Sequence, residues 1–140
     1  MLVEYARNVL GIGSAEHAET SPDADTLVVT PLSCSLVGQT HTVRILPGTR
    51  AAAVYDGRTE SDESYWCNYG LNPAYRHRFE QSGLRTSAVD DEGEVRLVEL
   101  DGHPFFFGTL FLPQMTSAPG TPHPLLAAFA AAVAQESVAR

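Results

Sequence analysis

Few side chains of this sequence stand at spacings that support chemistry. The two cysteines, Cys34 and Cys67, lie far apart and form no C-x-x-C pair, which is the spacing typical of zinc and redox sites. The five histidines show no H-x-x-x-H pattern. His17, with Glu16 and Glu19 beside it, is the nearest approach to a metal-binding group, and we favour a solvated loop. We therefore expect no metal and no cofactor.

Both cysteines are better explained as small buried hydrophobic side chains than as nucleophiles. Cys67 lies between Tyr65 and Tyr69, and no basic residue near it in sequence would stabilise the reactive thiolate. Whether Cys67 retains any chemistry is left open. Tyr65 and Trp66 either floor a small pocket or are buried beneath a sheet, and we favour burial.

The charge of the chain excludes two classes of partner. Nine basic residues stand against seventeen acidic ones, which gives a net charge of -8. Such a charge repels phosphate backbones and anionic lipid, so nucleic acid and membrane surfaces are poor candidates. The densest basic cluster, residues 76–78 (RHR), is expected to be a solvated helix face. Residues 1–7 carry an early acid and no long apolar stretch, so we expect a cytoplasmic protein without a signal peptide.

The elements of the first half follow from its apolar pattern. Apolar residues recur at three- and four-residue steps over residues 2–10, which predicts a helix, and no capping residue precedes it. Residues 12–25 are polar and acidic, as in a loop. Residues 26–32 and 41–46 are β-rich and predict a hairpin, and 51–55 is a candidate for another short strand.

Turn residues punctuate the second half. Asn72 and the proline after it predict a helix start, and Gly83 ends that helix. Residues 84–89 and 94–100 flank an acidic turn, which predicts a second hairpin. Residues 105–111 are apolar and predict a strand buried on both faces.

The last helix is introduced by two prolines and is rich in alanine. Residues 125–134 are wholly apolar but number about half of what a bilayer-crossing helix needs, so we expect a core helix. Its apolar stripe comprises Leu125, Leu126, Phe129 and Val133.

Several segments keep the order and separation of motifs in a known family. Residues 4–11 (EYARNVLG) resemble the helix that follows the nucleophile elbow in the glutaminase domain of CTP synthase. The C-terminal block of that domain resembles three segments of this chain: residues 101–106 (DGHPFF), 111–117 (FLPQMTS) and 122–125 (PHPL). Stand-alone proteins related to the C-terminal region of CTP synthase look similar as well.

The resemblance implies a fold. Class I glutamine amidotransferase domains are α/β and flavodoxin-like, with a mixed sheet and flanking helices. Residues 1–140 would form a single truncated domain of this kind, without the N-terminal half and its nucleophile elbow. The uncovered sheet would then need a second copy of the chain or a partner chain to cover it.

The same resemblance implies that the catalytic triad is degenerate. Class I glutamine amidotransferases use a cysteine, a histidine base and a glutamate that orients the base. The cysteine would lie upstream of Met1, and the family's Phe-His-Pro-Glu block is FLPQ here. Leu112 carries no proton to transfer, and the neutral Gln114 cannot balance an imidazolium.

The glutamine-binding segment departs from the family pattern too. The family has Arg-His-Arg-His-Arg-Tyr-Glu where residues 64–70 read SYWCNYG, so Asn68 falls where an arginine would hold the glutamine carboxylate. We assign Tyr65, Cys67, Asn68 and Tyr69 to this degenerate substrate-binding segment.

Two functions follow from these residues. The first is a catalytically inactive glutaminase relative that acts as a binding, regulatory or assembly module, as a homodimer or with a partner chain. The alternative is the C-terminal part of a working glutamine amidotransferase, which hydrolyses glutamine and transfers ammonia for CTP synthesis, with its cysteine in an upstream segment or partner chain. Two further family positions, His103 and His123, are expected to be turn or cap residues.

Overall fold

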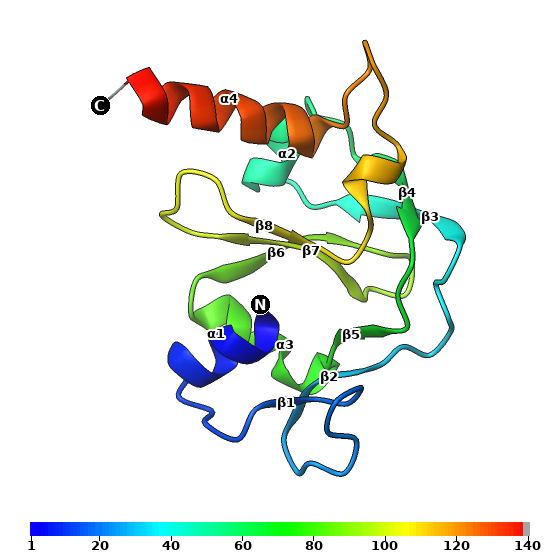
Figure 1. The fold of residues 1–140 in the computed structure, drawn as a ribbon, viewed down its shortest axis with the longest axis vertical. Helices are drawn as coiled ribbons and strands as arrows, with labels where there is room; N and C mark the ends of the chain where they lie inside the picture. The colour runs from blue at the N-terminus through cyan, green and yellow to red at the C-terminus, as the bar shows by residue number, and fades with distance from the viewer. Residues whose placement is uncertain (139–140) are drawn as a thin grey trace.

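The computed structural model describes residues 1–138, which form two sheets with helices packed around them (Figure 1). The helical segments are α1 (Leu2–Asn8), α2 (Arg50–Val54), η1 (Pro73–Tyr75), α3 (Arg76–Gln81), η2 (Pro113–Met115) and α4 (Pro124–Val138). The strands are β1 (Glu16–His17), β2 (Leu27–Pro31), β3 (Gln39–Ile45), β4 (Glu60–Tyr65), β5 (Tyr69–Leu71), β6 (Leu84–Val89), β7 (Val95–Leu100) and β8 (Phe107–Thr109).

The larger sheet has the strand order β4-β3-β6-β7-β8, and all of its neighbouring strands are antiparallel. It curls until a β-bridge joins Tyr65, at the end of β4, to Phe111. The smaller sheet has the order β1-β2-β5, with β1 parallel and β5 antiparallel to β2. The antiparallel larger sheet, the mixed smaller sheet and the flanking helices together confirm the α/β prediction.

Helices cover both faces of the larger sheet. In Figure 1, α2 and α4 lie on one side of it, while α1, α3 and the smaller sheet lie on the other side. Each side has its own apolar core. One core gathers Tyr55, Tyr65, Leu97, Phe111 and Leu125, and the other gathers Ala6, Val28, Phe79, Leu84 and Val98.

Several elements agree with their sequence predictions. The helix at the N-terminus and the hairpin formed by β6 and β7 are both present. The side chain of Asn72 accepts a hydrogen bond from the amide of Ala74 at 3.0 Å, as a helix cap should. Gly83 follows α3 with a φ of 95°, a left-handed conformation that strains other residues.

The predicted short strand at 51–55 is wrong, because this segment forms helix α2. Thr49 caps the helix by accepting a hydrogen bond from Ala52 N at 3.1 Å. The buried carboxylate of Glu99 accepts two more, from Arg50 N at 2.9 Å and Ala51 N at 3.0 Å. These three acceptors satisfy amides that the first turn of a helix leaves free.

The predicted pairing of 26–32 with 41–46 is also wrong, because the two strands belong to different sheets. The strand predicted at 105–111 is reduced to β8, whose residues are half-buried rather than buried on both faces. The predicted loop at 12–25 contains the short strand β1. Strands β4 and β5 had no predicted counterpart.

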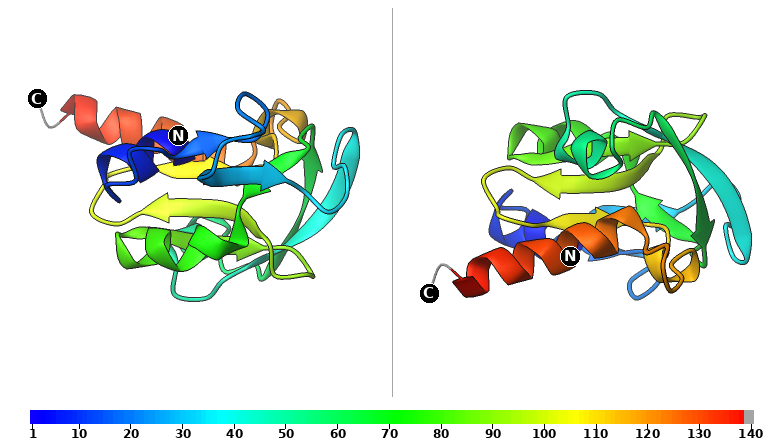
Figure 2. Two further views of the ribbon diagram at one scale, coloured as in Figure 1. Left: turned by 90° about the horizontal axis from the view of Figure 1, so that it is seen from below. Right: turned by 90° about the horizontal axis from the view of Figure 1, so that it is seen from above.

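The final helix buries less of its apolar surface than the sequence predicts. Leu125 is buried in the core, whereas Leu126 and Phe129 are 39% and 52% exposed. Both views in Figure 2 show the C-terminal end of α4 extending past the rest of the molecule. No helix in residues 1–138 is both long and apolar enough to cross a membrane.

Candidate functional site

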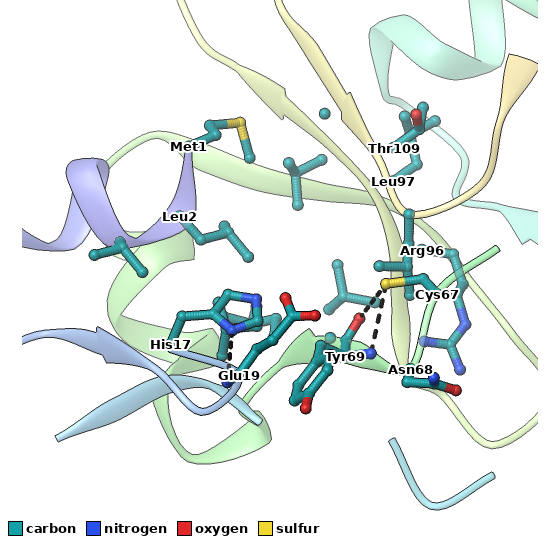
Figure 3. Close-up of a pocket in the computed structure, with 18 of the residues that line it drawn as sticks. Met1, Leu2, His17, Glu19, Cys67, Asn68, Tyr69, Arg96, Leu97 and Thr109 are labelled. Carbon is teal, nitrogen blue, oxygen red and sulfur yellow. Dashed lines mark hydrogen bonds between the residues drawn. The ribbon is translucent and has the colours of Figure 1, made fainter. Parts of the chain in front are cut away.

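A cavity of about 610 Å³ lies between the two sheets and beside the start of α1. Its walls come from residues that are far apart in sequence, including Leu2, His17, Cys67, Arg96 and Thr109. Figure 3 shows these side chains around the open space. The volume falls within the range of small-molecule sites in proteins.

Most of the segment that the resemblance assigns to a degenerate glutamine site borders this cavity. Cys67, Asn68 and Tyr69 line it, whereas Tyr65 is buried in the core beneath it. Burial raises the pKa of Tyr65 well above the usual tyrosine value. The positive charge of Arg96 opposes this shift, and the charges of Glu63 and Asp90 add to it.

Trp66 does not follow the expectation of burial. Its side chain is 67% exposed and forms part of the cavity wall, so Trp66 contributes to a pocket. Trp66 is the first residue after β4, which ends at Tyr65.

The two segments that were expected to be degenerate, residues 64–70 and 111–114, are neighbours in space. The amide of Leu112 donates a hydrogen bond to Ser64 O at 2.8 Å, beside the bridge between Tyr65 and Phe111. Leu112 is half-buried, and Gln114 is exposed on η2. Neither of these two residues lines the cavity within the described structure.

The cysteines differ in their surroundings. Cys34 is exposed, so the expectation that both thiols are buried is wrong. Cys67 is half-buried, and its thiol donates a hydrogen bond to Tyr69 O at 3.1 Å while Tyr69 N donates to its sulfur at 3.4 Å. The thiol of Cys67 is therefore held by its own turn rather than by a base.

His17 is the histidine of the cavity wall, and its polar contacts are local. Its Nδ1 accepts a hydrogen bond from Glu19 N at 3.0 Å, and its ring lies against that of Tyr69 with centroids 5.0 Å apart. Among the described residues, no group of three or more His, Cys, Asp or Glu side chains is arranged to hold a metal ion.

A second polar cluster, buried on the opposite side of the larger sheet, was missed by the sequence analysis. Glu63 is fully buried and accepts hydrogen bonds from Tyr55 Oη at 2.9 Å and Ser61 Oγ at 2.9 Å. His123 Nε2 lies 3.1 Å from both oxygens of Glu63. Burial first, and then the charge and hydrogen bond of Glu63, raise the pKa of Tyr55 far above its usual value.

The expected turn and cap roles of His103 and His123 are confirmed. His103 Nδ1 accepts a hydrogen bond from Phe105 N at 3.2 Å, and His123 Nδ1 accepts one from Leu125 N at 3.2 Å. His123 thus serves both the start of α4 and the buried cluster.

Arg96 is the other residue of interest that the sequence analysis did not single out. It lines the cavity with only 6% of its surface exposed. The available signal was a single arginine between the apolar residues Val95 and Leu97 of a predicted strand, since a charged side chain in a buried strand needs a partner.

Comparisons with known proteins identify relatives of the chain, although no family model matches it. A CTP synthase from Treponema pallidum is 42% identical over 140 residues, covering 94% of this chain and 24% of that protein. A CTP synthase from Hyphomonas neptunium is 34% identical over 154 residues, covering 97% of this chain and 28% of its own length. The chain therefore spans about a quarter of these relatives.

A solved structure gives the same result for the fold. The glutaminase domain of Trypanosoma brucei CTP synthase, determined with bound acivicin, matches with a TM-score of 0.88 and 28% identity. The match covers 96% of this chain and 56% of the solved one. From its motifs, its sequence relatives and its architecture, this chain is a relative of the CTP synthase glutaminase domain and has the fold of a class I glutamine amidotransferase.

Proposed function

We propose that this chain is a catalytically inactive member of the glutaminase fold that acts as a binding module with a regulatory or assembly role. The observation that carries the proposal is the pair Leu112 and Gln114, which stand where the family's block has a histidine and a glutamate. A leucine cannot accept the proton of a nucleophile, and a neutral amide cannot stabilise a charged imidazole.

The surroundings of the cavity support a binding role without hydrolysis. Cys67 and His17 both line the cavity, but the thiol of Cys67 is hydrogen-bonded to Tyr69 and Nδ1 of His17 to Glu19 N. Nucleophilic catalysis requires a base within hydrogen-bonding reach of the nucleophile, and no hydrogen bond joins these two side chains in the described structure. The cavity itself is large enough for a small molecule.

Ammonia release from glutamine tests the proposal. The purified chain, and its Cys67→Ser variant as a control, are incubated with glutamine and the ammonia is measured by a coupled assay. We expect no turnover above the buffer rate in either protein. Turnover by the chain that is lost in Cys67→Ser would refute the inactive assignment and favour a working amidohydrolase.

We further propose that the chain associates in the cytoplasm, as a homodimer or with a partner chain. The exposed apolar side chains of Leu126 and Phe129 lie on α4, and exposed apolar patches often mark contact surfaces. Sedimentation at low micromolar concentration should show a species larger than 15.1 kDa, or a monomer that shifts on adding a partner. A paired substitution, Leu126→Ser with Phe129→Ser, should abolish the larger species, and Arg58→Ser serves as a surface control.

A further inference from the structure

The cavity contains a buried positive charge that the proposed function does not yet use. Arg96 belongs to β7, and its side chain is only 6% exposed. Its Nη2 lies 2.5 Å from Asp90 Oδ2, in the turn that links β6 to β7. Asp90 is itself held in place, because its Oδ1 accepts hydrogen bonds from Glu92 N and Glu94 N.

The guanidinium of Arg96 has N–H groups that do not donate to any described residue. It carries five N–H groups, and the contact with Asp90 uses one terminal nitrogen. No other hydrogen bond joins its side chain to residues 1–138. Among the described residues, the fully enclosed side-chain polar atoms without a partner are Tyr65 Oη and Ser87 Oγ, so the remaining nitrogens of Arg96 are not fully enclosed. Since Arg96 lines the cavity, those donors are available to a bound molecule.

Asn68 adds a neutral donor to the same part of the cavity. In Figure 3 the side chains of Asn68, Arg96 and Cys67 lie together on one side, with His17 and Glu19 across from them. The Asn68 side chain makes no hydrogen bond with the residues described. A guanidinium beside an amide presents several N–H groups, which is what a carboxylate requires.

The rest of the cavity restricts the body of such a ligand. Leu2, Val29, Val98 and Leu110 contribute apolar wall, which disfavours a molecule that is polar throughout. Glu19 stands on the side away from Arg96, and a second anionic group would be repelled there. The net charge of -8 adds to that repulsion.

From this arrangement we propose that the cavity binds a small monocarboxylate with an apolar body, and that Arg96, assisted by Asn68, anchors the carboxylate. This inference rests on the proposed binding function and names its ligand class. The position that the family would use for a cation holds Asn68, and Arg96 brings a positive charge to the same cavity from a different strand.

The single tryptophan makes the proposal measurable in the unmodified protein. Trp66 lines the cavity, so its fluorescence should change when a molecule enters. Three probes separate the contributions of the carboxylate and of the apolar body to the binding affinity. Phenylacetate has both groups, phenylacetamide lacks the charge, and succinate lacks the apolar body. We expect phenylacetate to bind at least about tenfold more tightly than either of the others.

Substitutions then test whether phenylacetate binds at Arg96. Arg96→Gln should reduce phenylacetate affinity to that of phenylacetamide, while Arg85→Gln, an exposed arginine of the same sheet, should leave it within about twofold. In the wild-type protein, phenylacetate should slow iodoacetamide labelling of Cys67, measured by peptide mass spectrometry. Cys34, which is exposed and outside the cavity wall, serves as the internal control.

The outcomes distinguish the two proposals. Equal binding of phenylacetate and phenylacetamide to the wild-type protein, or unchanged labelling of Cys67 under saturating phenylacetate, would overturn the assignment of the carboxylate site. That comparison does not depend on how well Arg96→Gln folds. Ammonia release from glutamine would instead overturn the inactive binding module, whatever the probes do.

Discussion

The Nε2 atom of His123 lies 3.1 Å from each carboxylate oxygen of Glu63, and neither side chain is more than 4% exposed. Because Nδ1 of the same ring accepts the amide hydrogen of Leu125, the neutral ring carries its proton on Nε2 and donates it to Glu63. This contact joins the start of α4 to β4. It also gives the buried carboxylate of Glu63 a third partner, beside the hydroxyls of Tyr55 and Ser61.

Removing either member of this pair should destabilise the fold. Glu63→Gln and His123→Ala are each expected to lower the free energy of unfolding by about 1–3 kcal/mol, because a buried polar partner is left unsatisfied. Urea denaturation measures the change. Glu60→Gln, an exposed position on the same strand, should change stability by less than about 0.5 kcal/mol. Equal effects at positions 60 and 63 would contradict the structural role of the cluster.

The raised pKa values of Tyr55 and Tyr65 predict a loss of stability in alkali. The unfolded chain releases these protons above about pH 10, whereas the folded protein keeps them, so the contribution of each group is complete below that pH and declines above it. The slope should reach about 1.4 kcal/mol per pH unit for each tyrosine. Urea midpoints between about pH 9 and 11 should show a shallower decline in Tyr55→Phe than in Tyr75→Phe, which keeps both buried hydroxyls.

The start of α2 should depend on a residue from a distant strand. Glu99→Gln replaces one of the oxygens that accept the amides of Arg50 and Ala51 with an NH₂ group, which cannot accept. We expect a loss of about 1–3 kcal/mol in the free energy of unfolding. Glu92→Gln, in an exposed turn, is the matched control. If both variants unfold at the same denaturant concentration, Glu99 does not stabilise the helix.

The two thiols should react at different rates with a disulfide reagent such as DTNB. Cys34 is exposed, whereas Cys67 is half-buried with its sulfur hydrogen-bonded to the backbone of Tyr69. We expect a fast and a slow phase that differ by about tenfold or more, with the fast phase absent from Cys34→Ser. A single phase of two thiols in the wild-type protein would contradict this difference in accessibility.

Elements set by local signals could be predicted from the sequence. The apolar stripe over 2–10, the cap at Asn72 and the acidic turn between 89 and 95 are all signals contained in short stretches of sequence. The structure confirms the corresponding α1, η1 and β6–β7 hairpin. The resemblance to the glutaminase domain also came from contiguous motifs, such as residues 4–11. Local information was sufficient in these cases.

Elements that depend on distant partners could not be predicted. Strand β4 contains Glu60, Ser61, Asp62, Glu63 and Ser64, a run with low β-propensity that is ordered because β3 pairs with it and His123 binds Glu63. Helix α2 is likewise fixed by Glu99, 48 residues beyond Ala51. The cavity combines β7 with residues near the N-terminus, so the role of Arg96 emerges only when both sheets are in place.

The bridge between Tyr65 and Phe111 has a consequence for association. Since the end of β4 is paired within its own chain, those backbone groups are not offered as a template for a strand from another molecule. A second copy would therefore meet side chains rather than an open ladder at this end of the sheet. Association of two copies should therefore be disrupted by substitutions on α4. Short peptides that mimic β4 should have no effect on it.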